Sequence, residues 1–218
     1  MRPADRGARR GSVPLQDRVV WQAVSLLLAY PDEGHGVRLD TVQSLLAHLD
    51  GEPRLLVGRT LGELRDQDAM TVARRYVETF DLSRRRALLL TYWTAGDTRN
   101  RGMQMLAFAH AYRAAGTTPP AGEAPDHLPV VLEFAATVDP RAGRELLVEY
   151  RVPIEVLRRA LAEADSPYAH AVAAVCATLP AAGEEQVCRL RTAGAPVESV
   201  GLQPFQLTVP PRRTSGGL

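Results

Sequence analysis

Two short motifs hold the polar residues of this 218-residue chain that could do chemistry. The first is GDTRNRG at residues 96–102, and the second is PDHLP at residues 125–129. Asp97, Arg99 and His127 could form an acid–base cluster, because a carboxylate and an imidazole exchange protons while a guanidinium orients an anion. No Gly-x-Ser-x-Gly elbow, phosphate-binding loop or metal-ligand motif accompanies them. We therefore expect no catalytic residue, no metal site and no cofactor, and we keep a small helical enzyme as the alternative.

The first motif begins like a tight turn between two helices. Gly96 suits the left-handed conformation that commonly ends a helix, and Asp97 or Thr98 could cap the helix that follows. This interpretation explains Gly96 and Asp97 without any function. It leaves the arginines that follow unexplained.

Three residues of the first motif are unfavourable for the start of a helix. Arg99 and Arg101 place cations where the helix dipole is positive, at a cost of roughly 0.3–1 kcal/mol each. Gly102 costs about 1 kcal/mol relative to alanine inside a helix. These costs indicate a compensating contact, either an internal ion pair with Asp97 or Glu133 or a charged contact with a bound partner. Gly102 could also admit the close approach of another backbone.

The second motif also allows a structural and a functional interpretation. Asp126 could cap a helix and Pro129 fits its first turn. His127 lies near the positive end of that helix, which favours the neutral imidazole. One histidine with one aspartate does not make a metal site, so His127 is either a satisfied surface residue or part of a binding surface.

Aromatic residues concentrate just before these motifs, at Tyr76, Phe80, Tyr92 and Trp93. A stripe of this kind usually belongs to the core of a protein. Tyrosine keeps a polar tip, however, and favours half-buried positions, which also suits the wall of a groove.

Composition excludes several function classes. The net charge is only +1, which argues against a helical nucleic-acid binder that would use the three arginines at residues 84–86. Cys176 and Cys188 are too few for a disulfide framework or a zinc site, which fits a cytoplasmic location. No uninterrupted apolar segment reaches about 18 residues, so we expect no membrane insertion.

The hydrophobic spacing predicts an all-α, single-domain helical bundle. We place the domain at residues 14–179, after a disordered basic tail at residues 1–13 and before a flexible tail rich in proline and glycine at residues 180–218. Residues 99–115 form the longest predicted helix, which is apolar nearly all round and therefore expected to be central.

Three further boundaries follow from local signals. Gly51 and Pro53 should end a helix that begins at Asp40, and Thr60 with Glu63 has the spacing of a capping box for the next helix. Residues 83–93 are predicted as a helix that leads into the first polar motif.

Several of these segments together resemble the nitrate reductase molybdenum cofactor assembly chaperones, the NarJ or delta subunit family, and the wider set that includes TorD and DmsD. The resemblance extends over about residues 20–179, and residues 200–205 resemble the C-terminal tail of the family. It rests on residues 27–31 (LLAYP), 76–81 (YVETFD), 90–92 (LTY), 96–102 (GDTRNRG), 125–129 (PDHLP) and 132–134 (LEF).

The resemblance implies a non-enzymatic, cytoplasmic chaperone. Such proteins bind the N-terminal segment of the catalytic (alpha) subunit of respiratory nitrate reductase, support insertion of its molybdenum cofactor and delay its membrane assembly. An amphipathic helix of that client would lie in a groove between the helix of Tyr76, the helix of Arg99 and the loop before Leu128. The wider set often begins the second motif with Glu-Pro, whereas residues 123–125 are EAP here, so Glu123 stays outside the implied site. The implied peptide-binding residues are Tyr76, Phe80, Tyr92, Asp97, Arg99, Arg101, Asp126, His127 and Pro129.

Overall fold

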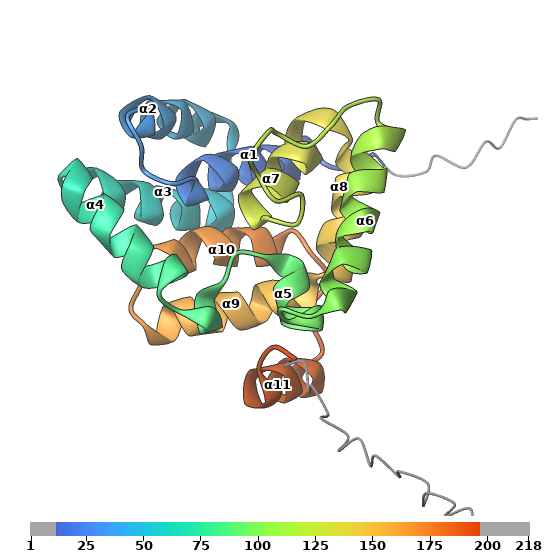
Figure 1. The fold of residues 1–218 in the computed structure, drawn as a ribbon. Helices are drawn as coiled ribbons and strands as arrows, with labels where there is room; N and C mark the ends of the chain where they lie inside the picture. Colours follow the sequence, from blue (N-terminus) through green and yellow to red (C-terminus); the bar gives the residue numbers. More distant parts are fainter. Residues whose placement is uncertain (1–11, 197–218) are drawn as a thin grey trace, which may run out of the picture.

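A computed structural model describes residues 12–196, and the regular structure of this part is helical, which confirms the all-α prediction (Figure 1). None of its helices is both long and apolar enough to cross a membrane. The α-helices are α1 (Leu15–Leu28), α2 (His35–Leu45), α3 (Gly51–Arg65), α4 (Ala69–Tyr76), α5 (Leu90–Ala95), α6 (Arg99–Ala114), α7 (Leu128–Glu133), α8 (Pro140–Glu149), α9 (Arg151–Glu163), α10 (Tyr168–Ala177) and α11 (Glu184–Ala193). Short 3₁₀ turns are η1 (Leu46–His48) and η3 (Arg84–Arg86), and π-helical turns are η2 (Val77–Asp81) and η4 (Phe134–Val138).

Helix α1 runs through the middle of the bundle and packs against α2, α3, α7 and α10 (Figure 1). Val20, Trp21 and Leu28 on this helix are fully buried. Burying each such side chain stabilises the fold by about 1.5–3 kcal/mol. The indole Nε1 of Trp21 donates a hydrogen bond of 2.9 Å to Thr178 Oγ1, so its polar atom is also satisfied.

Helix α3 corrects two predicted boundaries. Gly51 begins this helix instead of ending the one before, and Pro53 is tolerated because the first four amides of a helix have no intrahelical acceptor. Thr60 therefore lies inside α3 and caps nothing. Its buried hydroxyl donates a 2.8 Å hydrogen bond to the carbonyl of Pro167, so tertiary packing explains this threonine.

Two α-helices end in a π-helical turn, in which the amide bonds the carbonyl five residues earlier. Helix α4 continues into η2, and α7 continues into η4. Arginine side chains bond carbonyls of both turns: Arg86 Nε donates to Thr79 O at 2.8 Å, and Arg18 Nε donates to Ala136 O at 3.0 Å. These bonds satisfy carbonyl groups at the irregular ends of the helices.

Gly143 allows α8 to approach the second π-helical turn closely. A Cβ atom at this position would lie only 2.3 Å from Cα of Ala135. The sequence does not reveal this contact, because nothing in the neighbours of Gly143 along the chain shows that another helix crosses there.

Helix α6 lies at the edge of the bundle beside α8, so the prediction that it is central was wrong (Figure 1). Phe108 and Tyr112 are buried, whereas Met103 and Leu106 are 70% and 52% exposed. The apolar residues on two sides of α6 led to the prediction, but the bundle covers only one of those sides.

Helix α11 corrects the predicted flexible tail. Residues 184–193 are helical. This stretch contains no proline or glycine, and the glycines Gly183 and Gly194 lie only at its two ends. Val187 on α11 is fully buried in a small apolar cluster with Trp93 and Val156. Residues 1–11 and 197–218 lie outside the described part, including most of the predicted basic tail and the 200–205 segment.

Candidate functional site

The second polar motif forms a short antiparallel pairing with the segment that precedes α5. Leu90 N–H donates to Asp126 O at 3.0 Å, and Leu128 N–H donates to Leu88 O at 2.9 Å. Leu89 and His127 form the β-bridge between these two bonds. The prediction of one continuous helix at 83–93 is therefore only partly right. Residues 90–93 lie in α5, but the chain is extended between η3 and α5 because its backbone pairs there with a distant segment.

Asp126 points inward and accepts hydrogen bonds from Thr91. Its Oδ2 atom accepts the Thr91 backbone N–H at 3.1 Å and also the Thr91 hydroxyl. The Asp126 side chain is completely buried. The prediction that Asp126 caps the next helix was wrong, since His127 occupies the N-cap position and the carboxylate is used in this tertiary contact.

Arg101 joins the same buried group to the surface. Its Nε donates to Thr91 Oγ1 at 3.2 Å, and its Nη2 lies 3.7 Å from Asp126 Oδ2. Its Nη1 lies 3.6 Å from Oδ1 of the exposed Asp97. Of the two internal partners expected for the arginines, Asp97 is confirmed, whereas Glu133 is not among the partners of Arg101. Arg101 therefore links the two polar motifs. These contacts offset the cost of placing a cation in the first turn of α6.

The turn between α5 and α6 has the predicted geometry, whereas the prediction for Gly102 is not confirmed. Gly96 has φ of +60° at the end of α5, and the Thr98 side chain accepts the Asn100 N–H at 3.3 Å, as expected for a turn between helices. Among the described residues, no other segment lies within 4 Å of a Cβ atom added at Gly102, so the expected close approach does not occur there. Arg99 is exposed at the start of α6.

A pocket of about 460 Å³ opens in front of the bridge. Its wall combines aromatic and aliphatic side chains from α4, η2, the 87–89 segment and α5 with charged side chains at the edge. This size lies within the usual range of ligand-binding pockets. The lining residues are Tyr76, Phe80, Asp81, Ser83, Arg84, Ala87, Leu88, Leu89, Tyr92, Asp97, Glu123, Ala124 and His127.

Five of the nine predicted peptide-binding residues line this pocket, namely Tyr76, Phe80, Tyr92, Asp97 and His127. The other four do not line it, and three of those have structural contacts. Arg101 and Asp126 form the buried group described above. Pro129 is buried and its carbonyl accepts the Ser25 hydroxyl at 2.8 Å.

Tyr76 forms the buried end of the pocket. Its hydroxyl donates to the Leu28 carbonyl at 3.0 Å, and its ring contacts Phe80 and Tyr168 with centroids 4.8 and 6.0 Å away. Burial raises the pKa of the Tyr76 hydroxyl, so this group stays neutral. Phe80 is also buried, whereas Tyr92 is only half-buried and can contact a ligand directly.

His127 pairs with Glu123 at the edge of the pocket, where Nδ1 and Oε2 lie 3.3 Å apart. Burial lowers the pKa of His127, although Glu123 opposes this shift. The resemblance leaves Glu123 outside the implied site, whereas in the structure it lines the pocket. The i,i+4 spacing of Glu123 and His127 was the sequence signal that could have identified it.

The pocket edge carries more negative than positive charge. Asp81, Asp97 and Glu123 contribute three carboxylates, whereas Arg84 contributes one guanidinium. Such an edge favours a ligand that places basic groups beside its apolar anchors. The described residues contain no group of three or more histidine, cysteine, aspartate or glutamate side chains placed to hold a metal ion.

Comparison with known proteins agrees with this arrangement. The sequence pattern of the nitrate reductase delta subunit matches residues 40–174, which include the whole pocket. The chain belongs to the nitrate reductase delta subunit family. It is 30% identical to the probable nitrate reductase molybdenum cofactor assembly chaperone NarJ of Bacillus subtilis, over 74% of this chain and 89% of that protein. It is also 30% identical to the chaperone NarJ of Escherichia coli K12, over 67% of this chain and 63% of that protein.

This chain has a higher sequence identity to part of a longer protein than to the two NarJ chaperones. It is 61% identical to the nitrate reductase-like protein NarX of Mycobacterium tuberculosis H37Rv over 76% of this chain. The matched region spans only 25% of NarX. The two NarJ relatives are named as molybdenum cofactor assembly chaperones.

Proposed function

We propose that this chain is a non-enzymatic chaperone that binds the N-terminal segment of the catalytic (alpha) subunit of respiratory nitrate reductase. It acts in the cytoplasm, supports insertion of the molybdenum cofactor into that subunit and delays its membrane assembly until maturation is complete. The family membership supports the nitrate reductase partner. The pocket supports a peptide as the bound group.

The observation that carries this proposal is the composition of the pocket. Phe80, Leu89 and Tyr92 offer an apolar and aromatic surface, and the carboxylates lie at its edge. A short amphipathic helix with apolar anchors fits such a surface, and basic residues beside the anchors would pair with the carboxylates. The partly exposed Tyr92 ring and the Asp97 carboxylate are the groups that a client segment would contact first.

Binding alone performs the function in this scheme. While the segment lies in the pocket it cannot take part in membrane assembly, so the chaperone delays that step by competition. The internal contacts of Arg101 and Asp126 hold the pocket walls together, and Asp97 and His127 face the client. No bond is made or broken by the chaperone.

The enzyme alternative requires Asp97, Arg99 and His127 to converge on one substrate. Asp97 and His127 line the same pocket, but Arg99 does not. The nucleic-acid alternative requires the arginines at 84–86 to be free for phosphates. Arg86 instead donates to the Thr79 carbonyl and contacts the Glu78 carbonyl at 3.3 Å.

The test is the affinity of the full chain for a synthetic peptide with the N-terminal sequence of the catalytic subunit from the same organism, measured by calorimetry. We expect Tyr92→Ala to weaken binding about tenfold or more, the loss of one partly buried aromatic anchor. Met103→Ala is the matched control, since Met103 is exposed on α6 and does not line the pocket. Equal affinity for the Tyr92→Ala variant and the unaltered chain would exclude the pocket as the peptide site.

The client itself is tested by purification from the native cell. We expect the catalytic subunit of nitrate reductase to accompany the chain, with less molybdenum than the mature enzyme. Turnover of a small molecule by the purified chain alone would contradict a non-enzymatic function.

A further inference from the structure

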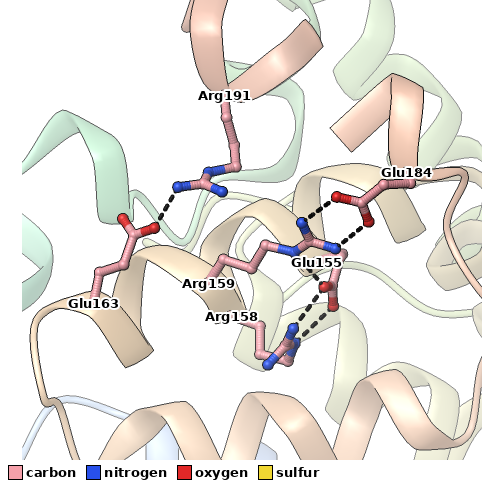
Figure 2. Close-up of polar contacts among 6 residues, drawn as sticks. All are labelled: Glu155, Arg158, Arg159, Glu163, Glu184 and Arg191. Carbon is pink, nitrogen blue, oxygen red and sulfur yellow. Dashed lines mark hydrogen bonds and ion pairs between the residues drawn. The ribbon is translucent and has the colours of Figure 1, made fainter. Parts of the chain in front are cut away.

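Two ion pairs, one near each end of α11, hold this helix against α9. We call the pairs Arg159–Glu184 and Arg191–Glu163 the clamp. Figure 2 shows the guanidinium of Arg159 facing the carboxylate of Glu184, with two bonds of 2.7 and 2.6 Å. Arg191 reaches Glu163 from the other end of α11. Ion pairs at two positions set the direction of the helix axis as well as its contact with α9.

A second layer of contacts orients Arg159. Its Nε donates to Glu155 Oε1 at 2.7 Å, and Arg158 makes two further 2.7 Å bonds to the same carboxylate (Figure 2). These bonds lower the pKa of Glu155 to about 2, so the carboxylate stays charged at neutral pH. The guanidinium of Arg159 is therefore held in one orientation before Glu184 pairs with it.

The end of α11 directs the chain back to the pocket. Gly194 has φ of +69°, which turns the backbone at the end of the helix. The carbonyl oxygen of Pro196 lies only 1.7 Å from where a Cβ atom of Gly96 would be. Because Gly96 precedes Asp97, which lines the pocket, Pro196 lies within about one residue length of the pocket edge.

We propose that residues 200–209 of the same chain occupy the pocket when no client is bound. This segment reads VGLQPFQLTV and has no charged residue. Its apolar side chains match the aromatic and aliphatic wall of the pocket. Three extended residues cover about 10 Å, so residues 197–199 can carry the chain from Gly96 into it.

The clamp makes this internal binding effective. A short tether holds a segment at an effective concentration in the millimolar range, so even weak contacts fill the pocket. A client segment must then displace residues 200–209 in order to bind. This consequence, unlike the internal docking itself, rests on the proposed function.

The docking is tested in the full chain by replacing Phe205 with the photo-reactive residue p-benzoylphenylalanine and mapping the cross-links by mass spectrometry. We expect cross-links within one chain to pocket residues such as Tyr92, Leu89 or Phe80. The same photo-reactive residue at Val37, which is exposed on α2, is the control and should give none of these products. Cross-links from position 205 only to other surfaces, or only between chains, would overturn the proposal, and so would none at all.

The role of the clamp is tested by a charge-removing pair of variants. Arg159→Gln combined with Arg191→Gln removes both ion pairs between α11 and α9, and should reduce the pocket cross-links at least fivefold. Arg189→Gln is the matched control, because Arg189 pairs with Glu185 inside α11. An equal cross-link yield in the double variant and this control would refute delivery of the segment by the clamp.

A binding measurement separates this inference from the proposed function. Leu202→Asp with Phe205→Asp should raise the affinity for the client peptide about tenfold, because the internal competitor is lost. Unchanged affinity would overturn the competition. If no form of the chain binds the client peptide while the pocket cross-links persist, the proposed function fails and the internal docking stands.

Discussion

Thr91 and Asp126, 35 residues apart in the chain, are joined by two hydrogen bonds to one buried carboxylate oxygen. The backbone amide and the hydroxyl of Thr91 both donate to Asp126 Oδ2. Because each residue belongs to a segment that reaches the pocket, this contact fixes one wall against the other. Arg101 adds positive charge at the same point without lining the pocket.

Loss of the Asp126 charge should destabilise the fold. Asp126→Asn keeps the shape but weakens the bonds from Thr91 and leaves Arg101 partly uncompensated, so the free energy of unfolding should fall by about 1–3 kcal/mol. Asp97→Asn is the control, since the exposed Asp97 pair should contribute less than about 0.5 kcal/mol. Urea unfolding measures both variants. Similar losses in the two variants would argue against a special role of the buried group.

Stability should depend on the titration of His127. Its pKa lies below the ordinary value of 6.5, so the folded chain binds fewer protons than the unfolded chain just below that pH. The free energy of unfolding should therefore fall as pH drops below 6.5 and level off once pH is below the folded-state pKa. Urea unfolding between pH 5 and 7.5 measures this loss.

Two variants assign the loss to His127. His127→Gln should reduce it, whereas Glu123→Gln should enlarge it, because Glu123 is the strongest of the carboxylates that raise the pKa of His127. His35, whose pKa is also lowered by burial, remains in both variants, so only the differences between the curves count. Identical curves for all three proteins would rule out this assignment.

Two glycines should respond to alanine with opposite signs. Gly143→Ala forces a methyl group against Ala135 and should cost about 1–3 kcal/mol through overpacking. Gly102→Ala meets open space inside a helix and should stabilise the protein by up to about 1 kcal/mol. Thermal unfolding of both variants provides the comparison. A stabilising Gly143→Ala would mean that α8 and η4 can separate without cost.

The two cysteines should differ in reactivity. Burial raises the pKa of the Cys176 thiol to about 12, whereas Cys188 is exposed on α11. The thiolate is the reactive form, so Cys176 should react with iodoacetamide at pH 8 roughly a hundredfold or more slowly than Cys188. Mass spectrometry of timed samples gives both rates. Equal rates in the folded protein would show that α10 opens readily.

Local features of the site could be predicted because they depend on neighbouring residues. The positive φ of Gly96 and the capping by Thr98 follow from glycine having no Cβ and from a threonine hydroxyl reaching an amide two residues ahead. The same local rules gave the wrong role for Asp126, because an aspartate just before a helix usually caps that helix. Here the carboxylate meets the Thr91 amide and hydroxyl, and a distant contact overrides the local preference.

Sequence alone determined that the chain is helical, where its main turns lie and which family it resembles, because periodicity, glycine and capping residues act over a few positions. Tertiary structure decided that α6 lies at the edge, that α11 is folded and that Glu123 joins the pocket. It also decided that Arg101 and Asp126 brace the pocket without lining it. These outcomes depend on contacts between segments tens of residues apart, whose geometry is set only when the whole bundle packs.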